Sequence, residues 1–191
     1  VIEHSVLSAH RHVFGVLTWF SLLAALGLGP AGAVLYRMSE SVARAWSMPS
    51  GASPAWVSDT LQQTGREAWR KVDWLPARIT AVAFAVVGNF EEAIDCWRNH
   101  AQRFPDDNDG VVLSATSGAL GVRLGGEALR SDVDIVSAAH GADLYEPQDS
   151  ESTPGRAPEL AHLASVVGLV WRTVVLWMVL LALLTLARLL G

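Results

Sequence analysis

The chain has 191 residues, with 19 acidic and 14 basic side chains that give a formal net charge of −5 at neutral pH. Hydrophobic residues make up 51% of the sequence and charged residues 17%, below the roughly one quarter that is usual for soluble domains. The acidic balance argues against nucleic acid as a partner, and the single cysteine excludes a framework of internal disulfides. We therefore predict an all-α, polytopic membrane helical bundle whose partner is the lipid bilayer.

The first strongly apolar segment covers residues 13–36 and contains no charged side chain over 24 residues. At about 1.5 Å per helical residue, this length is enough to cross a hydrocarbon core of about 30 Å. Arg11 and Arg37 flank the segment. We predict a spanning segment here, with a broken helix or a turn between two pieces in its second half, because that half contains Gly27, Gly29, Pro30 and Gly32.

The polar segment 37–73 is predicted to be a loop on the cytoplasmic side of the membrane. Positive charges close to spanning segments favour that side, and this segment carries Arg37, Arg44, Arg66, Arg70 and Lys71. We therefore expect a multi-pass protein of the bacterial inner (plasma) membrane.

The stretch "WLPARITAVAFAVVGNF", residues 74–90, contains Arg78 and has too few apolar residues after it to span a bilayer alone. We predict a re-entrant or buried helix, which is stable at membrane depth only where other protein covers it. Glu91 and Glu92 follow Gly88-Asn89 and predict the acidic first turn of a further helix.

The loop "FPDDNDG" contains three acidic side chains, at Asp106, Asp107 and Asp109. Three carboxylates can hold Mg²⁺ through oxygen ligands, but such residues also form turns and helix caps, which is the role we favour. His10 and His12 are two residues apart, so they point in different directions on a helix. We therefore predict no metal site.

The segment 110–126 is rich in glycine and other small residues. A phosphate-binding loop requires a lysine followed by serine or threonine after the last glycine, and "GALGVRLGGE" supplies neither. Small residues recur instead at a helical spacing, which allows close contact between helix backbones. We predict a small-residue helix over 110–126. Ser117, Gly121 and Gly125 are expected to form one line of small residues on it, with Ser114 and Gly118 on an adjacent line. These faces could also join two copies of the chain into a homo-oligomer.

The last third of the chain divides into a polar part and an apolar part. Residues 131–160 are acidic and rich in serine and proline, which predicts a flexible, partly disordered linker. Residues 161–191 are predicted to be a C-terminal transmembrane helix, with an uncharged run between Arg172 and Arg188. Arg188 can extend to a membrane interface.

Three segments of the sequence stand out together, residues 28–37, 73–98 and 108–126, and their most specific pieces are "LPARI" and "SGALGVRLGG". In this order and spacing they resemble the CobD/CbiB family of integral membrane proteins, and the resemblance covers nearly the whole chain. The same superfamily includes AmpE, a membrane protein associated with β-lactamase regulation, and "VDWLPARITAVAFAVVGNFEEA" is similar to AmpE-like sequences too. The resemblance implies that residues 1–130 form the membrane-embedded core of the family and that an N-terminal part is missing.

The resemblance implies the activity of an adenosylcobinamide-phosphate synthase. This reaction joins aminopropanol, or its phosphate, to adenosylcobyric acid as an amide, and it requires ATP and Mg²⁺. A corrinoid is then a ligand. The alternative is an AmpE-like, non-catalytic regulatory or sensory protein of the inner membrane, which requires neither ATP nor Mg²⁺.

Positions that match the family, together with Glu3 and Asp109 close to such positions, are candidates for ligand binding, and the catalytic residues stay unassigned. The acids that the family places after its Tyr-Lys pair and before its "LPAR" motif are absent here, because Ala43, Trp69 and Arg70 stand in those positions. Loss of these acids supports a degenerate synthase or the non-catalytic alternative. The ligand-binding candidates are Glu3, Tyr36, Arg37, Arg78, Asn108, Asp109 and Arg123.

Overall fold

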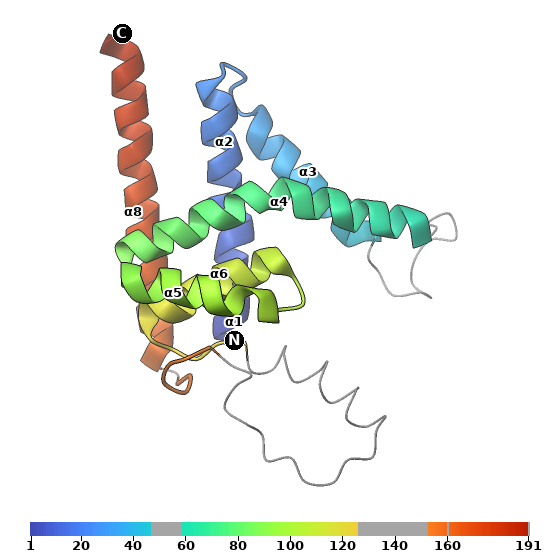
Figure 1. Cartoon of the computed structure of the whole chain (residues 1–191). Helices are drawn as coiled ribbons and strands as arrows, with labels where there is room; N and C mark the ends of the chain where they lie inside the picture. Colours follow the sequence, from blue (N-terminus) through green and yellow to red (C-terminus); the bar gives the residue numbers. More distant parts are fainter. Residues whose placement is uncertain (47–58, 126–152, 160, 191) are drawn as a thin grey trace.

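The computed structural model describes residues 1–46, 59–125, 153–159 and 161–190, and this part of the chain is helical (Figure 1). Beyond the helices it contains one isolated bridge, between Val122 and Arg156. The all-α prediction is therefore confirmed for the described residues. Most of the predicted linker, residues 131–160, lies outside them.

The N-terminal 25 residues form one continuous helical rod. It consists of α1 (Ile2–Ala9), a π-helical turn (His10–Phe14) and α2 (Gly15–Ala25). After a turn, α3 (Ala31–Trp46) leads back along α2. The predicted segment 13–36 is therefore not one spanning helix. Its glycines break it, with positive φ angles of 83° at Gly27 and 57° at Gly29, and the turn between two pieces is confirmed.

Helix α4 (Asp59–Val87) lies across α2 and contains Pro76. It begins 15 residues before the helix predicted over 74–90. The described parts of the predicted loop 37–73 are helical, because they belong to α3 and α4. The hydrophobic pattern missed this extension because the first turns of α4 are polar and pack only along one side.

Two capped helices follow α4, as the acidic residues at their starts predicted. Helix α5 (Phe90–His100) begins after Asn89, whose side chain accepts a hydrogen bond from the backbone N–H of Glu92 at 3.4 Å. A short 3₁₀ turn (Ala101–Arg103) leads to α6 (Asp107–Leu120). Asp106 accepts hydrogen bonds from the backbone of Asn108 and Asp109, so its predicted role as a cap is confirmed.

Helix α6 is shorter than the predicted helix 110–126. Gly121 adopts a left-handed conformation (φ 64°) and ends the helix. Gly125 therefore lies outside the helix, and the expected line of Ser117, Gly121 and Gly125 on one helix face is wrong. The close contact is made by Gly118, where a Cβ atom would lie 2.2 Å from the backbone oxygen of Glu92 in α5. This face of α6 is used within the chain.

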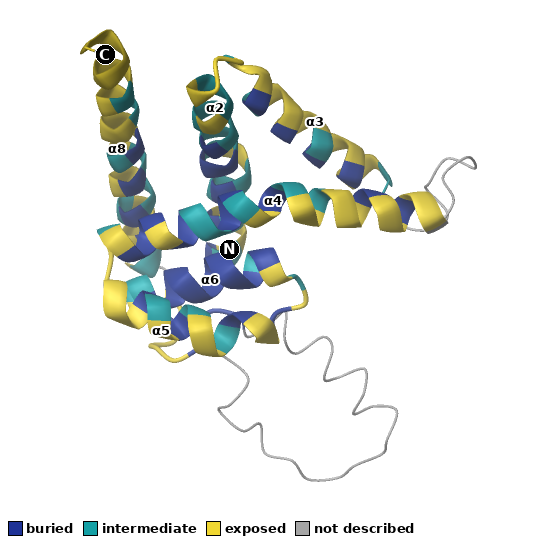
Figure 2. Cartoon of the chain, turned by 45° about the horizontal axis from the view of Figure 1, so that its top comes forward, coloured by how far each residue is buried: buried dark blue, intermediate teal, exposed yellow. Residues whose placement is uncertain are grey.

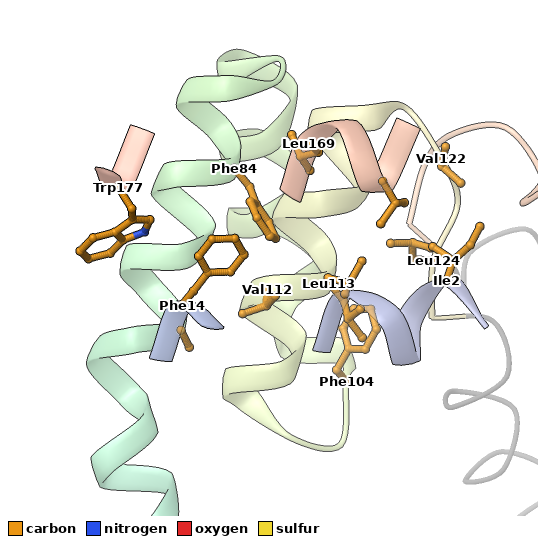
Figure 3. Close-up of a cluster of buried hydrophobic side chains, with 13 residues drawn as sticks. Ile2, Phe14, Phe84, Phe104, Val112, Leu113, Val122, Leu124, Leu169 and Trp177 are labelled. Atoms are coloured by element: carbon orange, nitrogen blue, oxygen red, sulfur yellow. The ribbon is translucent and has the colours of Figure 1, made fainter. Parts of the chain in front are cut away.

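The core surrounds α6, which is buried over most of its length (Figure 2). Phe14 and Phe84 meet edge to face with ring centroids 5.4 Å apart, joining the N-terminal rod to α4 (Figure 3). Large apolar side chains from other parts of the chain join them in this cluster, including Ile2, Phe104, Val112, Leu113, Val122, Leu124, Leu169 and Trp177. Burial of these side chains stabilises the arrangement of the rod on α4 and α6.

Helix α8 (Ala161–Leu190) begins against the core and then runs beside α2, well beyond α4 (Figure 1). Among the described residues it is the one helix long and apolar enough to cross a membrane, and only 11% of its most apolar window is buried. The C-terminal helix is thus present as predicted. A bundle with several spanning helices is not confirmed.

Candidate functional site

A buried polar cluster joins the N-terminal rod, α3 and α4. The Tyr36 hydroxyl donates to Asp73 Oδ1 at 2.7 Å, and His10 Nε2 lies 3.1 Å from the same oxygen. The other ring nitrogen of His10 is 3.0 Å from the Thr80 hydroxyl. All four side chains are buried. Because buried polar groups are costly unless hydrogen-bonded, this cluster fixes how the three helices meet.

The π-helical turn lies directly at this cluster. It starts at His10 and contains Arg11, so two consecutive polar side chains lie at this point of the rod. His10 is buried, and Arg11 is only partly buried. Such turns are rare and occur frequently at functional sites. The local departure from α-helix thus coincides with the polar part of an otherwise apolar rod.

A second polar layer lies beside the first and reaches the surface. Arg11 donates to Asp109 at 2.6 Å, and this pair is only partly exposed. Arg78 donates to the Asn108 side chain at 3.1 Å, and Asn108 in turn donates to the backbone oxygen of Arg70 at 2.9 Å. The first turn of α6 is thereby tied to both the rod and α4.

We predict that Asp109 makes stability depend on pH. Burial raises the pKa of Asp109 above its ordinary value of 3.8, although the Arg11 guanidinium opposes the shift. The folded protein therefore binds the proton more tightly than the unfolded chain, so Asp109 favours folding below its unfolded pKa and loses this contribution as the pH rises through its folded pKa.

Thermal unfolding of the wild type and of Asp109→Asn, measured at several pH values between neutrality and 3.8, tests this prediction. We expect the wild type to gain stability relative to Asp109→Asn as the pH falls from neutrality towards 3.8. A relative loss of wild-type stability over the same range would contradict the prediction, because it would mean that the Arg11 pair outweighs burial.

A cavity of about 220 Å³ opens beside these layers, between the rod, α3, α4 and the loop before α6. Behind its wall, the Tyr36 ring packs against Trp69 with centroids 5.1 Å apart. Three arginines and two carboxylates line the cavity, so its surface is strongly charged. We call it the arginine cavity; its lining is Arg11, Glu40, Ala43, Arg44, Arg66, Trp69 and Asp106.

Glu40 is the buried carboxylate of the arginine cavity, and both of its oxygens are occupied. One accepts from Arg37 and the other from Arg44, while the side chain is only 6% exposed. Two guanidinium groups on one carboxylate leave no free oxygen for a cation. Within the described residues there is also no group of three histidine, cysteine or acidic side chains able to hold a metal. Glu40 therefore does not fit the role of a Mg²⁺ ligand.

A second, larger cavity of about 460 Å³ is lined in part by Arg78. It is shared by α4, α5 and α6 and is lined by Arg98, Trp97 and Asp107 among others. Arg78 also lies over the Trp74 ring, 4.2 Å from its centroid. The side chain of Arg78 is thus held in place by its contacts with Trp74 and Asn108.

Four of the candidates chosen from the sequence gather around Asp73. Tyr36 bonds to Asp73 directly. The Asp73 carboxylate also attracts the Arg78 guanidinium and repels the Asp109 carboxylate, so both lie within electrostatic range of it. Asn108 completes this group through Arg78. The structure therefore brings together residues that are up to 73 positions apart in the sequence.

The other three candidates lie elsewhere. Arg37 pairs with Glu40 on α3. Glu3 accepts a hydrogen bond from the backbone N–H of Gly125 at 2.6 Å, and the backbone N–H of Arg123 donates to Arg156 at 2.8 Å. Glu3 and Arg123 thus belong to the far end of α6, where they attach the chain after that helix to α1 and to the segment before α8.

Sequence reasoning missed several polar residues of the site. Asp73 and Thr80 are seven positions apart on one helix, a spacing that places both on the same face. The sequence predicts this helix only from residue 74, which leaves Asp73 in the predicted loop 37–73. His10 was weighed only as a metal ligand beside His12, and their opposite orientations are confirmed, because His10 is buried and His12 is exposed. Arg11 and Glu40 carried no separate signal.

Comparison with known proteins places this arrangement in a family. Residues 8–156 match the model of the CobD/Cbib protein family. The "Cobalamin biosynthesis protein CobD" of Stutzerimonas stutzeri is 32% identical over 175 residues, which are 88% of this chain and 48% of the relative. The protein of the same name from Chromobacterium violaceum is 34% identical over 133 residues, 66% of this chain and 38% of the relative.

A further CobD from Mycobacterium tuberculosis H37Rv is 46% identical over 70 residues, 32% of this chain and 22% of the relative. The chain spans about half the length, or less, of these curated relatives. No solved structure matches it. The family model covers most of the chain, so the chain belongs to the CobD/CbiB protein family.

Proposed function

We propose that this chain acts in cobalamin biosynthesis as part of a membrane protein that forms an amide in the manner of adenosylcobinamide-phosphate synthase. Its relatives carry the name of cobalamin biosynthesis proteins. The observation that supports the proposal best is the arginine cavity, because Arg11, Arg44 and Arg66 converge there. Guanidinium groups bind phosphate through paired hydrogen bonds.

The size of the arginine cavity indicates which part of the substrates it accepts. Its volume of about 220 Å³ is below the range of about 300–1,000 Å³ that is typical for drug-sized ligands. It therefore suits a phosphate group, such as that of aminopropanol phosphate, and a corrin would have to bind outside it. The Trp69 ring forms an apolar wall for the short carbon chain of such a ligand.

The positions where the family resemblance implies acidic residues also point to the arginine cavity as the substrate site. Ala43 and Trp69 stand at two of these positions, and both line the arginine cavity. Two other carboxylates are present there, Glu40 and Asp106. Glu40 lies three residues before Ala43 on the same face of α3, but its ion pairs with Arg37 and Arg44 hold those side chains in place and leave no role for it in holding Mg²⁺.

A non-catalytic, AmpE-like regulatory role is the second candidate. It is favoured by the same replacements, since Ala43 and Trp69 cannot supply charge to a metal–nucleotide complex. In this case the arginine cavity would bind a phosphate-bearing ligand without converting it. The two candidate functions therefore use the same cavity and differ in whether the bound ligand is converted to a product.

We expect the protein to restore growth on cobyric acid to a bacterial strain that lacks its own synthase, and we expect Arg66→Gln to abolish that growth. Arg66 lies on the exposed side of the cavity, and its side chain donates to Gln62 on its own helix, so the change removes charge with little effect on the fold. Lys71→Gln is the matched control, because it removes an exposed positive charge from the same helix outside the cavity.

Direct binding separates the two candidates. The purified wild-type protein is titrated with aminopropanol phosphate by calorimetry, alongside Arg66→Gln and Lys71→Gln. Binding without growth of the complemented strain supports the non-catalytic role. Neither binding nor growth, with the protein present in the membrane, would reject the arginine cavity as a substrate site.

A further inference from the structure

The turn between α2 and α3 is apolar and projects away from the core. Leu26 is 70% exposed and Leu28 is 59% exposed, although both are large hydrophobic residues. The turn lies beside the C-terminal end of α8, at the opposite side of the molecule from α5 (Figure 1). A water-exposed turn normally carries polar residues, so this composition needs an apolar environment.

The backbone of this turn is prepared for such an environment. A helix normally ends with four carbonyl groups that have no partner in the helix, and lipid cannot supply one. In α2 these four carbonyls all accept hydrogen bonds. Those of Leu22, Leu23 and Ala24 accept from backbone N–H groups of the turn, at 3.3, 2.9 and 3.1 Å.

Arg188 of α8 completes the set. Its Nη2 atom donates to the backbone oxygen of Ala24 at 2.6 Å and to that of Ala25 at 2.5 Å. A cation at this place also faces the negative ends of two helices, α2 and α8 itself. The sequence predicted that Arg188 would extend to a membrane interface. In the structure it connects two chain segments that are more than 160 residues apart.

The hairpin is also closed by contacts nearer to the core. Gly32 lies so close to α2 that a Cβ atom there would be 2.0 Å from the backbone oxygen of Trp19. The Trp19 side chain donates to the backbone oxygen of Val72 in α4 at 3.1 Å. The α2–α3 hairpin is therefore one unit, anchored to α4 at its base and to α8 at its tip.

We propose that the α2–α3 hairpin inserts into the lipid bilayer beside α8, with the turn Leu26–Pro30 in contact with lipid and with Arg188 holding it to α8. The occupant of the exposed apolar surface is thus lipid. The uncharged segment 13–36 then enters the bilayer and returns to the same side as a hairpin, whereas the sequence predicted that it crosses the bilayer once. This proposal concerns how the chain sits in the membrane and does not depend on the function of the arginine cavity.

Depth-dependent fluorescence quenching tests lipid contact. Cys96→Ser removes the native cysteine of the chain, and an environment-sensitive fluorophore is attached at Leu28→Cys in phosphatidylcholine vesicles that contain doxyl-labelled lipid. We expect a loss of fluorescence like that of a probe at Leu183→Cys on the exposed face of α8. A probe at Glu91→Cys, on the exposed start of α5, is the unquenched control. Equal, unquenched signals at residues 28 and 91 would overturn the proposal.

The role of Arg188 needs its own measurement. Spin labels at Leu28→Cys and Leu190→Cys report the distance between the hairpin tip and the end of α8. In the Cys96→Ser protein we expect a narrow distance distribution while Arg188 is present and a broad one after Arg188→Gln. Arg172→Gln, which removes an exposed arginine from the same helix, should leave the distribution narrow. An unchanged distribution after Arg188→Gln would show that Arg188 does not hold the hairpin.

Discussion

Replacing Asp73 by alanine is expected to destabilise the protein by about 3–5 kcal/mol, because removal of one member of a buried polar pair leaves its partners unsatisfied. The Tyr36 hydroxyl and His10 Nε2 both bond to Asp73 Oδ1 and have no access to water. The rod, α3 and α4 meet at this carboxylate. Thermal or denaturant unfolding of the purified protein measures the loss.

Tyr36→Phe is the matched variant for this prediction. It removes only the hydroxyl, so Asp73 keeps its contact with His10, and we expect a smaller cost of about 1–3 kcal/mol. Equal losses for the two substitutions would contradict the view that Asp73 is the shared acceptor. A stability close to that of the wild type after Asp73→Ala would mean that water reaches the cluster.

Replacing Gly118 by alanine is expected to force α5 and α6 apart. The added Cβ atom would meet three backbone atoms of Glu92 and Ala93, at 2.2, 2.5 and 2.6 Å. Backbone cannot move aside as a flexible side chain can, so we expect a loss of at least about 1–3 kcal/mol, the usual cost of overpacking. The free energy of unfolding, compared with that of the wild type, measures it.

Gly168→Ala provides the control, because it makes the same chemical change in α8, where an added Cβ atom meets nothing within 4 Å. Alanine favours a helix over glycine by up to about 1 kcal/mol, so this variant should be as stable as the wild type or more stable. If Gly118→Ala behaved like Gly168→Ala, the close contact between α5 and α6 would be wrong.

The local signals in the sequence were reliable where they depended on neighbouring residues. Asn89 and Asp106 cap the helices that follow them, because a side-chain oxygen there reaches backbone N–H groups two or three residues ahead. The break within 13–36 followed from its glycines. The predicted end of α6 lies too far along the chain. A glycine such as Gly121 looks the same in the sequence whether it lies inside a helix or ends it, and only its left-handed backbone conformation distinguishes the two cases.

The polar site could be predicted only in part. Tyr36, Arg78 and Asn108 were found because they match a family pattern, and Asp109 because it is one of three acidic side chains in one loop. Tyr36 bonds to Asp73, and the other three lie on the same side of the core. Asp73 itself was missed. Its partners His10 and Tyr36 are 63 and 37 residues away, and no periodicity connects positions at such separations.

The sequence alone determined the helical class, the apolar C-terminal helix, the two helix caps and the family, because each depends on composition, on short-range hydrogen bonding or on a linear pattern. Tertiary structure decided which polar groups meet. The pairing of Arg188 with the end of α2 and the convergence of three arginines on one cavity both depend on how helices cross. Crossing is set by packing of the buried faces around α6, which acts over distances that local sequence does not encode.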